Sequence, residues 1–177
     1  KGLREGQAME LWKRVSSFTG FSFCKSHSGS YAQLSFQCTY LKAYYPAQFL
    51  SAVISNNHGF YSRDTYVNEA RRCGIRILPI DINESGIKYY GKSDWMRPGL
   101  MHIKGISQNG LAKIIEERKH NGRFHNLLDF RNRVGLHRHN IEKLILVGAF
   151  DGLGLTQPEL LFALETGVHQ EKNLLFD

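Results

Sequence analysis

The first 55 residues show apolar positions at helical spacing. Three of them, ending at Phe18, lie on one stripe and predict a helix over residues 7–18. Residues 31–45 carry apolar side chains on more than one side, so we expect a helix that is buried on more than one face. Pro46 interrupts this pattern and suits the first turn of a further helix, over residues 47–55.

The next segment combines one helix with short extended stretches. Ser62 is a suitable N-cap for a helix that runs to Cys73, and Gly74 is the expected left-handed residue at its end. Residues 75–78 alternate and include the β-branched Ile75 and Ile77, which predicts a strand ended by Pro79. Two further short strands are possible, over residues 87–90 and 95–97.

From residue 99 the pattern changes to short amphipathic helices joined by glycine turns. The expected helices lead through residues 112–118, 124–134, 140–147 and 158–164. The sequence therefore predicts a mainly α fold with a small β element, in which a helical subdomain precedes a tandem helix-hairpin-helix domain.

Two glycine turns carry the first chemical argument. Glycine has no Cβ, so its backbone can approach a phosphate closely, and the next helix offers free N–H groups and a favourable dipole. Such turns grip phosphates and read no bases. The candidate DNA-binding residues are Lys104, Gly105, Ile106, Ser107, Gly148, Gly152 and Gly154.

Ser107 stands where the usual hairpin has a second glycine. Serine offers an N–H and a hydroxyl, but it tolerates fewer backbone angles than glycine does. The alternative for either turn is a glycine that caps one helix and joins it to the next without touching DNA.

Charge agrees with a nucleic-acid partner. The chain has 177 residues, a net charge of +7 and a pI of about 9.4, which favours an anionic partner. No apolar run approaches the ~20 residues needed to cross a bilayer, so no membrane partner is expected. The three cysteines are widely spaced without a C-x-x-C pair, as is typical of reduced thiols in a cytoplasmic protein.

A cation and an imidazole stand beside a second expected helix start. Lys25 and His27, next to free helix N–H groups, would suit a triphosphate. The alternative is a solvated loop in which His27 only caps or packs.

Several ordered motifs closely resemble the bacterial DNA polymerase III alpha subunit family. Within that family, Phe23-Cys-Lys25 is more similar to the error-prone branch than to the replicative one. The motifs that carry the resemblance are FSFCKSHSGSYA at 21–32, SFQ at 35–37, YLKAYYPAQF at 40–49, EARR at 69–72, GIRILPIDINES at 74–85, Gly105, LDF at 128–130 and GAFDGLG at 148–154.

The resemblance implies a domain order and a set of nucleotide contacts. Residues 1–83 would be the C-terminal part of the polymerase fingers, and residues 84–98 a connecting segment with short strands. Residues 99–165 would be the tandem helix-hairpin-helix domain, and residues 166–177 a tail or linker. The matching candidates for contact with the incoming nucleotide are Lys25, His27 and Lys42.

The resemblance also implies what this chain does not contain. Members of the family hold two Mg²⁺ ions with palm aspartates in a D-x-D arrangement. No D-x-D occurs here; Asp81-Ile-Asn83 comes nearest. We therefore expect no catalytic or metal-binding residue in this chain, with Mg²⁺ and nucleotide transfer belonging to the rest of the parent polymerase.

The expected partners are double-stranded primer–template DNA, a dNTP and the remaining polymerase domains. A sliding clamp is a further candidate, because Asn173-Leu-Leu-Phe176 loosely resembles clamp-binding peptides.

Two alternatives stay open. The chain could be a stand-alone DNA-binding module of a repair or recombination protein, although such a module needs no finger-like half. It could also be a hydrolase that uses Cys24 and His27, but no third residue is evident that would orient the imidazole.

Overall fold

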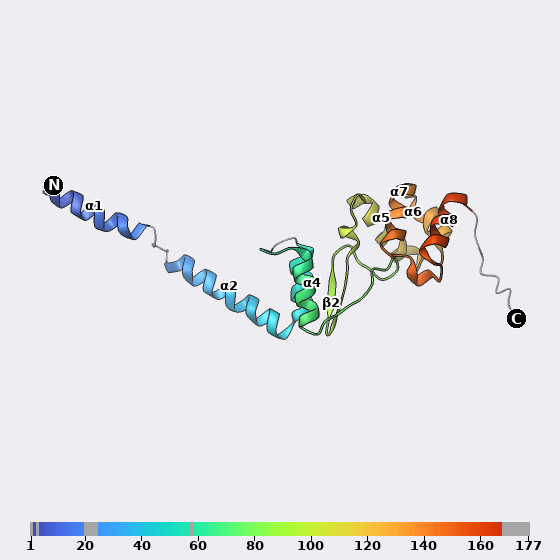
Figure 1. Cartoon of the computed structure of the whole chain (residues 1–177), viewed down its shortest axis with the longest axis horizontal. Helices are drawn as coiled ribbons and strands as arrows, with labels where there is room; N and C mark the ends of the chain where they lie inside the picture. Colours follow the sequence, from blue (N-terminus) through green and yellow to red (C-terminus); the bar gives the residue numbers. More distant parts are fainter. Residues whose placement is uncertain (1, 3, 20–24, 57–58, 168–177) are drawn as a thin grey trace. The chain divides into compact units, whose positions relative to one another are not determined.

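The computed structural model describes residues 2, 4–19, 25–56 and 59–167 (Figure 1). Among these residues it has eight α-helices, two 3-10 helices and one three-stranded sheet, so the predicted mainly α fold with a small β element is confirmed. The chain divides into two compact units, residues 1–41 and 42–177, and each is described by itself.

The first unit holds α1 (Glu5–Thr19) and most of α2 (Lys25–Tyr44). α1 agrees with the helix expected over residues 7–18, whereas α2 begins at Lys25, six residues before the helix expected over residues 31–45. The expected burial of the second helix on more than one face is wrong for this chain, because every side chain that the structure describes in α2 is exposed. An apolar face is buried only where another element covers it, and no residue described before Ala47 is buried.

The second unit begins with α3 (Pro46–Ser55) and α4 (Arg63–Arg72). Local signals set their ends as predicted. Pro46 opens α3, the Ser62 hydroxyl accepts a hydrogen bond from the Thr65 amide, and Gly74 follows α4 with a φ of +77°.

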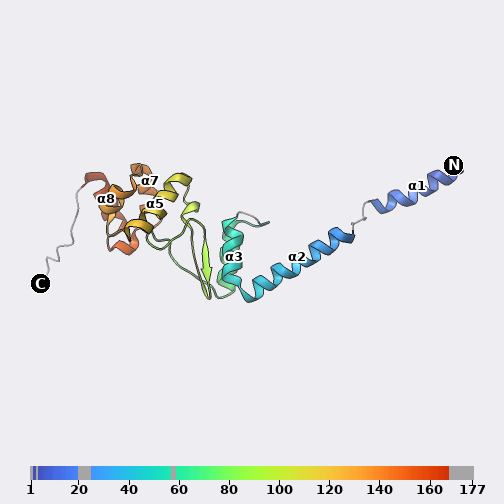
Figure 2. The ribbon, with the colours of Figure 1, turned by 180° about the vertical axis from the view of Figure 1, so that it is seen from behind.

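A small sheet packs beside α3 (Figure 2). Its order is β1-β3-β2, with β1 parallel to β3 and β2 antiparallel to β3. Gly91 allows the close approach, because a Cβ built there would collide with the Ala47 carbonyl. The strands are β1 (Arg76–Ile77), β2 (Tyr90–Lys92) and β3 (Trp95–Arg97).

The strand expected over residues 87–90 begins three residues later than predicted. The carbonyls of Gly86 and Ile87 accept hydrogen bonds from the amides of Leu100 and Met101. This segment therefore pairs with the chain beyond β3, and the ladder between β2 and β3 starts only at Tyr90.

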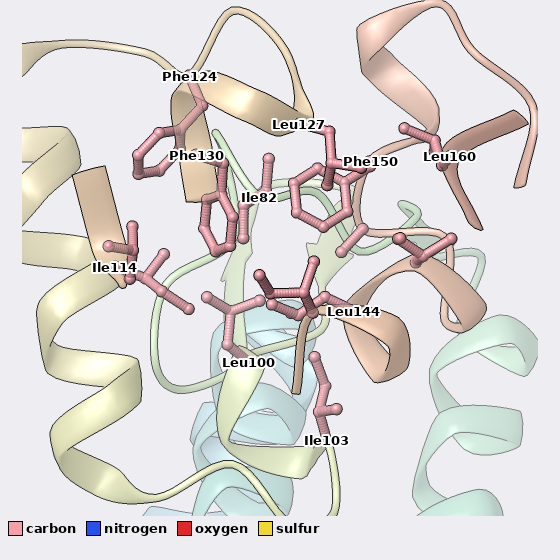
Figure 3. Close-up of a cluster of buried hydrophobic side chains, with 14 of the residues drawn as sticks. Ile82, Leu100, Ile103, Ile114, Phe124, Leu127, Phe130, Leu144, Phe150 and Leu160 are labelled. Atoms are coloured by element: carbon pink, nitrogen blue, oxygen red, sulfur yellow. The ribbon is translucent and has the colours of Figure 1, made fainter. Parts of the chain in front are cut away.

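A helical domain follows, built around one core (Figure 3). The rings of Phe124, Phe130 and Phe150 meet edge to face, with centroids 4.9 and 5.0 Å apart. Its elements are η1 (Leu100–His102), α5 (Gln108–Asn121), α6 (Leu127–Val134), α7 (Arg138–Leu146), η2 (Asp151–Leu153) and α8 (Gln157–Thr166).

The segment over residues 80–85 is part of this helical core, although it precedes the first helix of the domain by many residues. Ile82 is almost fully buried among the core side chains (Figure 3). Its amide donates to the Ala149 carbonyl at 2.7 Å. The Asn83 side chain donates to the Phe124 carbonyl at 2.9 Å and accepts from the Phe124 amide at 2.7 Å.

Two arginines form hydrogen bonds and ion pairs inside the helical domain. Arg118 donates to the carbonyls of Ile82 and Ser85, and burial lowers the pKa of its guanidinium. Arg133 pairs with Glu117 and Asp129 at 3.1 Å each and lies over the Phe124 ring. These two cations therefore stabilise the fold of the domain.

We predict that Ile82→Ala destabilises the second unit by about 2–5 kcal/mol, because it leaves a cavity in the core. Ile87→Ala is the matched control, since Ile87 is 39% exposed and the same atoms are removed. Urea unfolding of the intact chain, followed by circular dichroism, measures both. Equal losses from the two variants would contradict the place given to Ile82.

Candidate nucleic-acid interface

The first hairpin turn, residues 103–107, lies between η1 and α5. Ile103 is buried and Ile106 packs against the core, so these two side chains fix the turn to the helical domain. Lys104, Gly105 and Ser107 are exposed. Gly105 has a φ of +85°, the left-handed conformation that the glycine pattern predicts.

Ser107 takes the place of the second glycine without backbone strain. Its φ is −69° and its ψ 156°, and its hydroxyl accepts a hydrogen bond from the Gly110 amide at 3.1 Å. Ser107 is therefore the N-cap of α5. The amides of Gln108 and Asn109 belong to the first turn, where helix geometry provides no acceptor.

The electrostatics at this end of α5 favour an anion. No acidic residue occurs in the first turn of the helix. The partial positive charge of the helix N-terminus is therefore not neutralised by a carboxylate of its own first turn.

Lys143 of α7 joins the first hairpin turn, and the sequence analysis missed it. Its ammonium lies so close to Gly105 that a Cβ built there would collide with Nζ. Lys104 and Lys143 also line the same largely apolar cavity of about 710 Å³. Among the residues that the structure describes, neither lysine has a carboxylate partner. Two cations thus converge on the exposed backbone of the turn.

The second hairpin turn, residues 147–156, joins α7 to α8 and contains η2. Gly148 and Gly154 have φ values of +80° and +85°, while Ala149 and Phe150 enter the core. The glycine turn predicted here is therefore present as a local structure.

The surroundings of the second hairpin turn are acidic. A Cβ built on Gly148 would lie 2.7 Å from an oxygen of Asp151, and one built on Gly152 would lie 2.8 Å from an oxygen of Asp81. At the start of α8, the Glu159 carboxylate accepts hydrogen bonds of 2.7 Å from both the amide and the hydroxyl of Thr156.

The candidate nucleotide contacts differ in what the structure describes. The side chain of Lys25 lies outside the described atoms. The His27 ring packs edge to face on Tyr31, with centroids 4.6 Å apart. The ammonium of Lys42 is paired with Glu69 at 2.8 Å, so its charge is already compensated. All three stay predictions.

Metal and membrane sites can be judged for the described residues. Across 4–19, 25–56 and 59–167, no group of three or more His, Cys, Asp or Glu side chains could hold a metal ion. No helix described there has the length and apolar character needed to span a bilayer. Cys24 and the peptide over residues 173–176 lie outside the described residues.

The chain is similar to a known family model and to known bacterial proteins. Residues 74–160 match the family model of the helix-hairpin-helix motif. The chain is 38% identical over 169 residues to DNA polymerase III subunit alpha of Escherichia coli (strain K12), and 35% identical over 173 residues to that of Deinococcus radiodurans. The Thermus aquaticus subunit is 33% identical over 169 residues.

The chain is homologous to one region of the DNA polymerase III alpha subunits. The matches cover 92–93% of this chain but only 13–14% of each of these three alpha subunits. The resemblance to the polymerase III alpha family is thus confirmed. The error-prone branch stays a prediction, because these relatives carry one common name.

The residues matched by the helix-hairpin-helix model include a segment that packs into the helical core. It begins at Gly74, before the sheet, and so includes the segment over residues 80–85. That segment supplies Ile82 and Asn83 to the helical core. The hairpin helices and the segment over residues 80–85 therefore share one hydrophobic core.

We predict that the Glu69 carboxyl titrates with a pKa of about 2. Hydrogen bonds from Arg72 and then from Lys42 hold the pKa well below its ordinary value. Because the folded pKa is depressed, the stabilisation is complete above the pKa of the unfolded carboxyl and is lost as the pH falls towards 2.

NMR titration of the Glu69 side-chain carbon measures this pKa directly. Lys42→Met should raise the pKa part of the way, while Lys92→Met should leave it unchanged. A midpoint near the ordinary glutamate value in the wild-type chain would contradict both ion pairs.

Proposed function

We propose that this chain is part of a DNA-directed DNA polymerase of the alpha-subunit type, and that it holds primer–template duplex through backbone phosphates. One observation carries the proposal. The first hairpin turn presents the N-terminus of α5 beside Lys104 and Lys143, with no acidic residue in the first turn of that helix. A phosphate is the anion that such a turn accommodates best.

The chemistry of the site predicts how the duplex is bound. Helix amides and ammonium groups interact with phosphate oxygens and not with base edges, so binding should be independent of sequence. Each lysine that neutralises a phosphate displaces a counterion, so affinity should fall steeply with rising salt. This behaviour suits a polymerase, which must bind whatever sequence it copies.

Homology outside the helical domain supports a polymerase over a stand-alone repair or recombination module. The alignments cover 92–93% of the chain and so extend over α2 to α4 as well as the hairpins. A module that only binds DNA would need no counterpart of these helices.

The finer assignments belong to the same proposal. Lys25 and His27 contact the incoming dNTP, while Lys42 contributes indirectly through its ion pair with Glu69. Mg²⁺ binds in the catalytic domain of the parent enzyme, which also contacts a sliding clamp. Synthesis takes place in the cytoplasm, in replication or in error-prone repair. These statements are what the resemblance to the alpha subunits implies for the parent enzyme.

We predict that the intact chain binds a fluorescent primer–template duplex with an affinity that falls steeply with salt. Lys104→Ala and Lys143→Ala should each lower the magnitude of the slope of log K against log salt by about one, because each removes one phosphate contact. Fluorescence anisotropy at several salt concentrations gives these slopes.

Lys119→Ala is the control for overall charge. Lys119 lies eleven residues beyond Gln108 on α5, about 16 Å along the helix axis from the first hairpin turn. Its removal should change the slope much less. A wild-type chain without salt-sensitive binding would contradict the proposal.

A further inference from the structure

The two hairpin turns share local features but differ in their electrostatic surroundings. Each contains a glycine with positive φ, and each leads into a helix whose first residue is a glutamine, Gln108 in α5 and Gln157 in α8. The difference between the turns therefore comes from the side chains around them.

The first hairpin turn itself, residues 103–107, contains no acidic side chain. Ser107 caps one amide of α5 with a neutral hydroxyl, and the first turn contains no acid. Lys143 reaches this turn from α7 because Gly105 leaves room for its ammonium. An incoming phosphate would meet attraction from Lys104, Lys143 and the helix dipole together.

At the second hairpin turn, three carboxylates lie against Gly148, Gly152 and the start of α8. Glu159 already covers the N-terminus of α8 by accepting from the Thr156 amide and hydroxyl. Asp151 lies against Gly148, and Asp81 lies against Gly152. Asp81 is held in place because its other oxygen accepts from the amides of Asn83 and Glu84, at 2.7 and 3.0 Å.

The cation at the start of α7 is engaged elsewhere. Arg138, the first residue of α7, is paired with Glu165 near the end of α8. The close approach that the glycines permit in the second hairpin turn is thus used by the protein's own carboxylates.

We propose that the tandem domain is functionally asymmetric: the first hairpin turn contacts duplex phosphates, and the second is an internal joint that holds the segment over residues 80–85. This inference rests on the proposed binding of duplex DNA and adds which turn performs it. Lys143 is a phosphate-contacting residue on this account, although it belongs to the helix that leads into the second turn.

A matched pair of substitutions tests the asymmetry. Gln108→Glu and Gln157→Glu place the same charge at the first residue of α5 and of α8. A carboxylate at that position is favourable for the helix itself, so both variants should fold, as thermal melting by circular dichroism can verify. Binding is measured by anisotropy with the intact chain and the same primer–template duplex at fixed low salt.

We expect Gln108→Glu to weaken binding about tenfold or more, because the new charge faces a bound phosphate. Gln157→Glu should change the affinity by no more than about twofold, as for a charge remote from the contact. Equal losses, or a larger loss from Gln157→Glu, would overturn the asymmetry while leaving duplex binding itself intact. Absence of salt-sensitive binding by the wild-type chain would instead overturn the proposed function.

Discussion

The insertion of Ile82 and Asn83 into the helical core is the constraint on which the second unit depends. Ile82 fills the space beside the phenylalanine cluster, and Asn83 exchanges two hydrogen bonds with the backbone of Phe124. Arg118 of α5 donates hydrogen bonds to the carbonyls of Ile82 and Ser85 and so pairs two further backbone groups of the segment. A buried segment needs such partners for its backbone, because unpaired polar groups in a core are costly.

This insertion also positions both hairpin turns. The Ile82 amide donates to the Ala149 carbonyl, and Asp81 lies against Gly152, so the second turn is fixed to the segment that follows β1. The second turn in turn joins α7 to α8. Lys143 can then reach Gly105, and the first hairpin turn gains a cation that its own sequence does not supply. The structural role of one turn thus supports the binding role of the other.

Local signals in the sequence predicted most of the elements. Pro46, Ser62 and Gly74 set helix ends through their own backbone preferences, and the structure confirms each of them. The position of β2 was predicted three residues too early because its start depends on pairing between Gly86 and Leu100, which periodicity does not reveal. The exposure of α2 was missed because an apolar pattern indicates which faces can be buried but not what covers them.

The site was less predictable than the fold. Glycine spacing located both turns, but the approach of Lys143 to Gly105 and of Asp81 to Gly152 depends on tertiary packing. Part of the difference between the turns was nevertheless readable. Thr156 and Glu159 have the spacing of a capping box, which indicates that a carboxylate covers the start of the following helix.

The most direct test of the central claim is an NMR titration of the ¹⁵N-labelled intact chain with primer–template duplex. The account predicts that the amides of Gly105, Gln108 and Asn109 shift strongly at low salt and recover as salt is added. The amides of Gly148 and Gln157 should move little. Shifts concentrated at the second hairpin turn, with none at the first, would contradict the assignment of the phosphate contact.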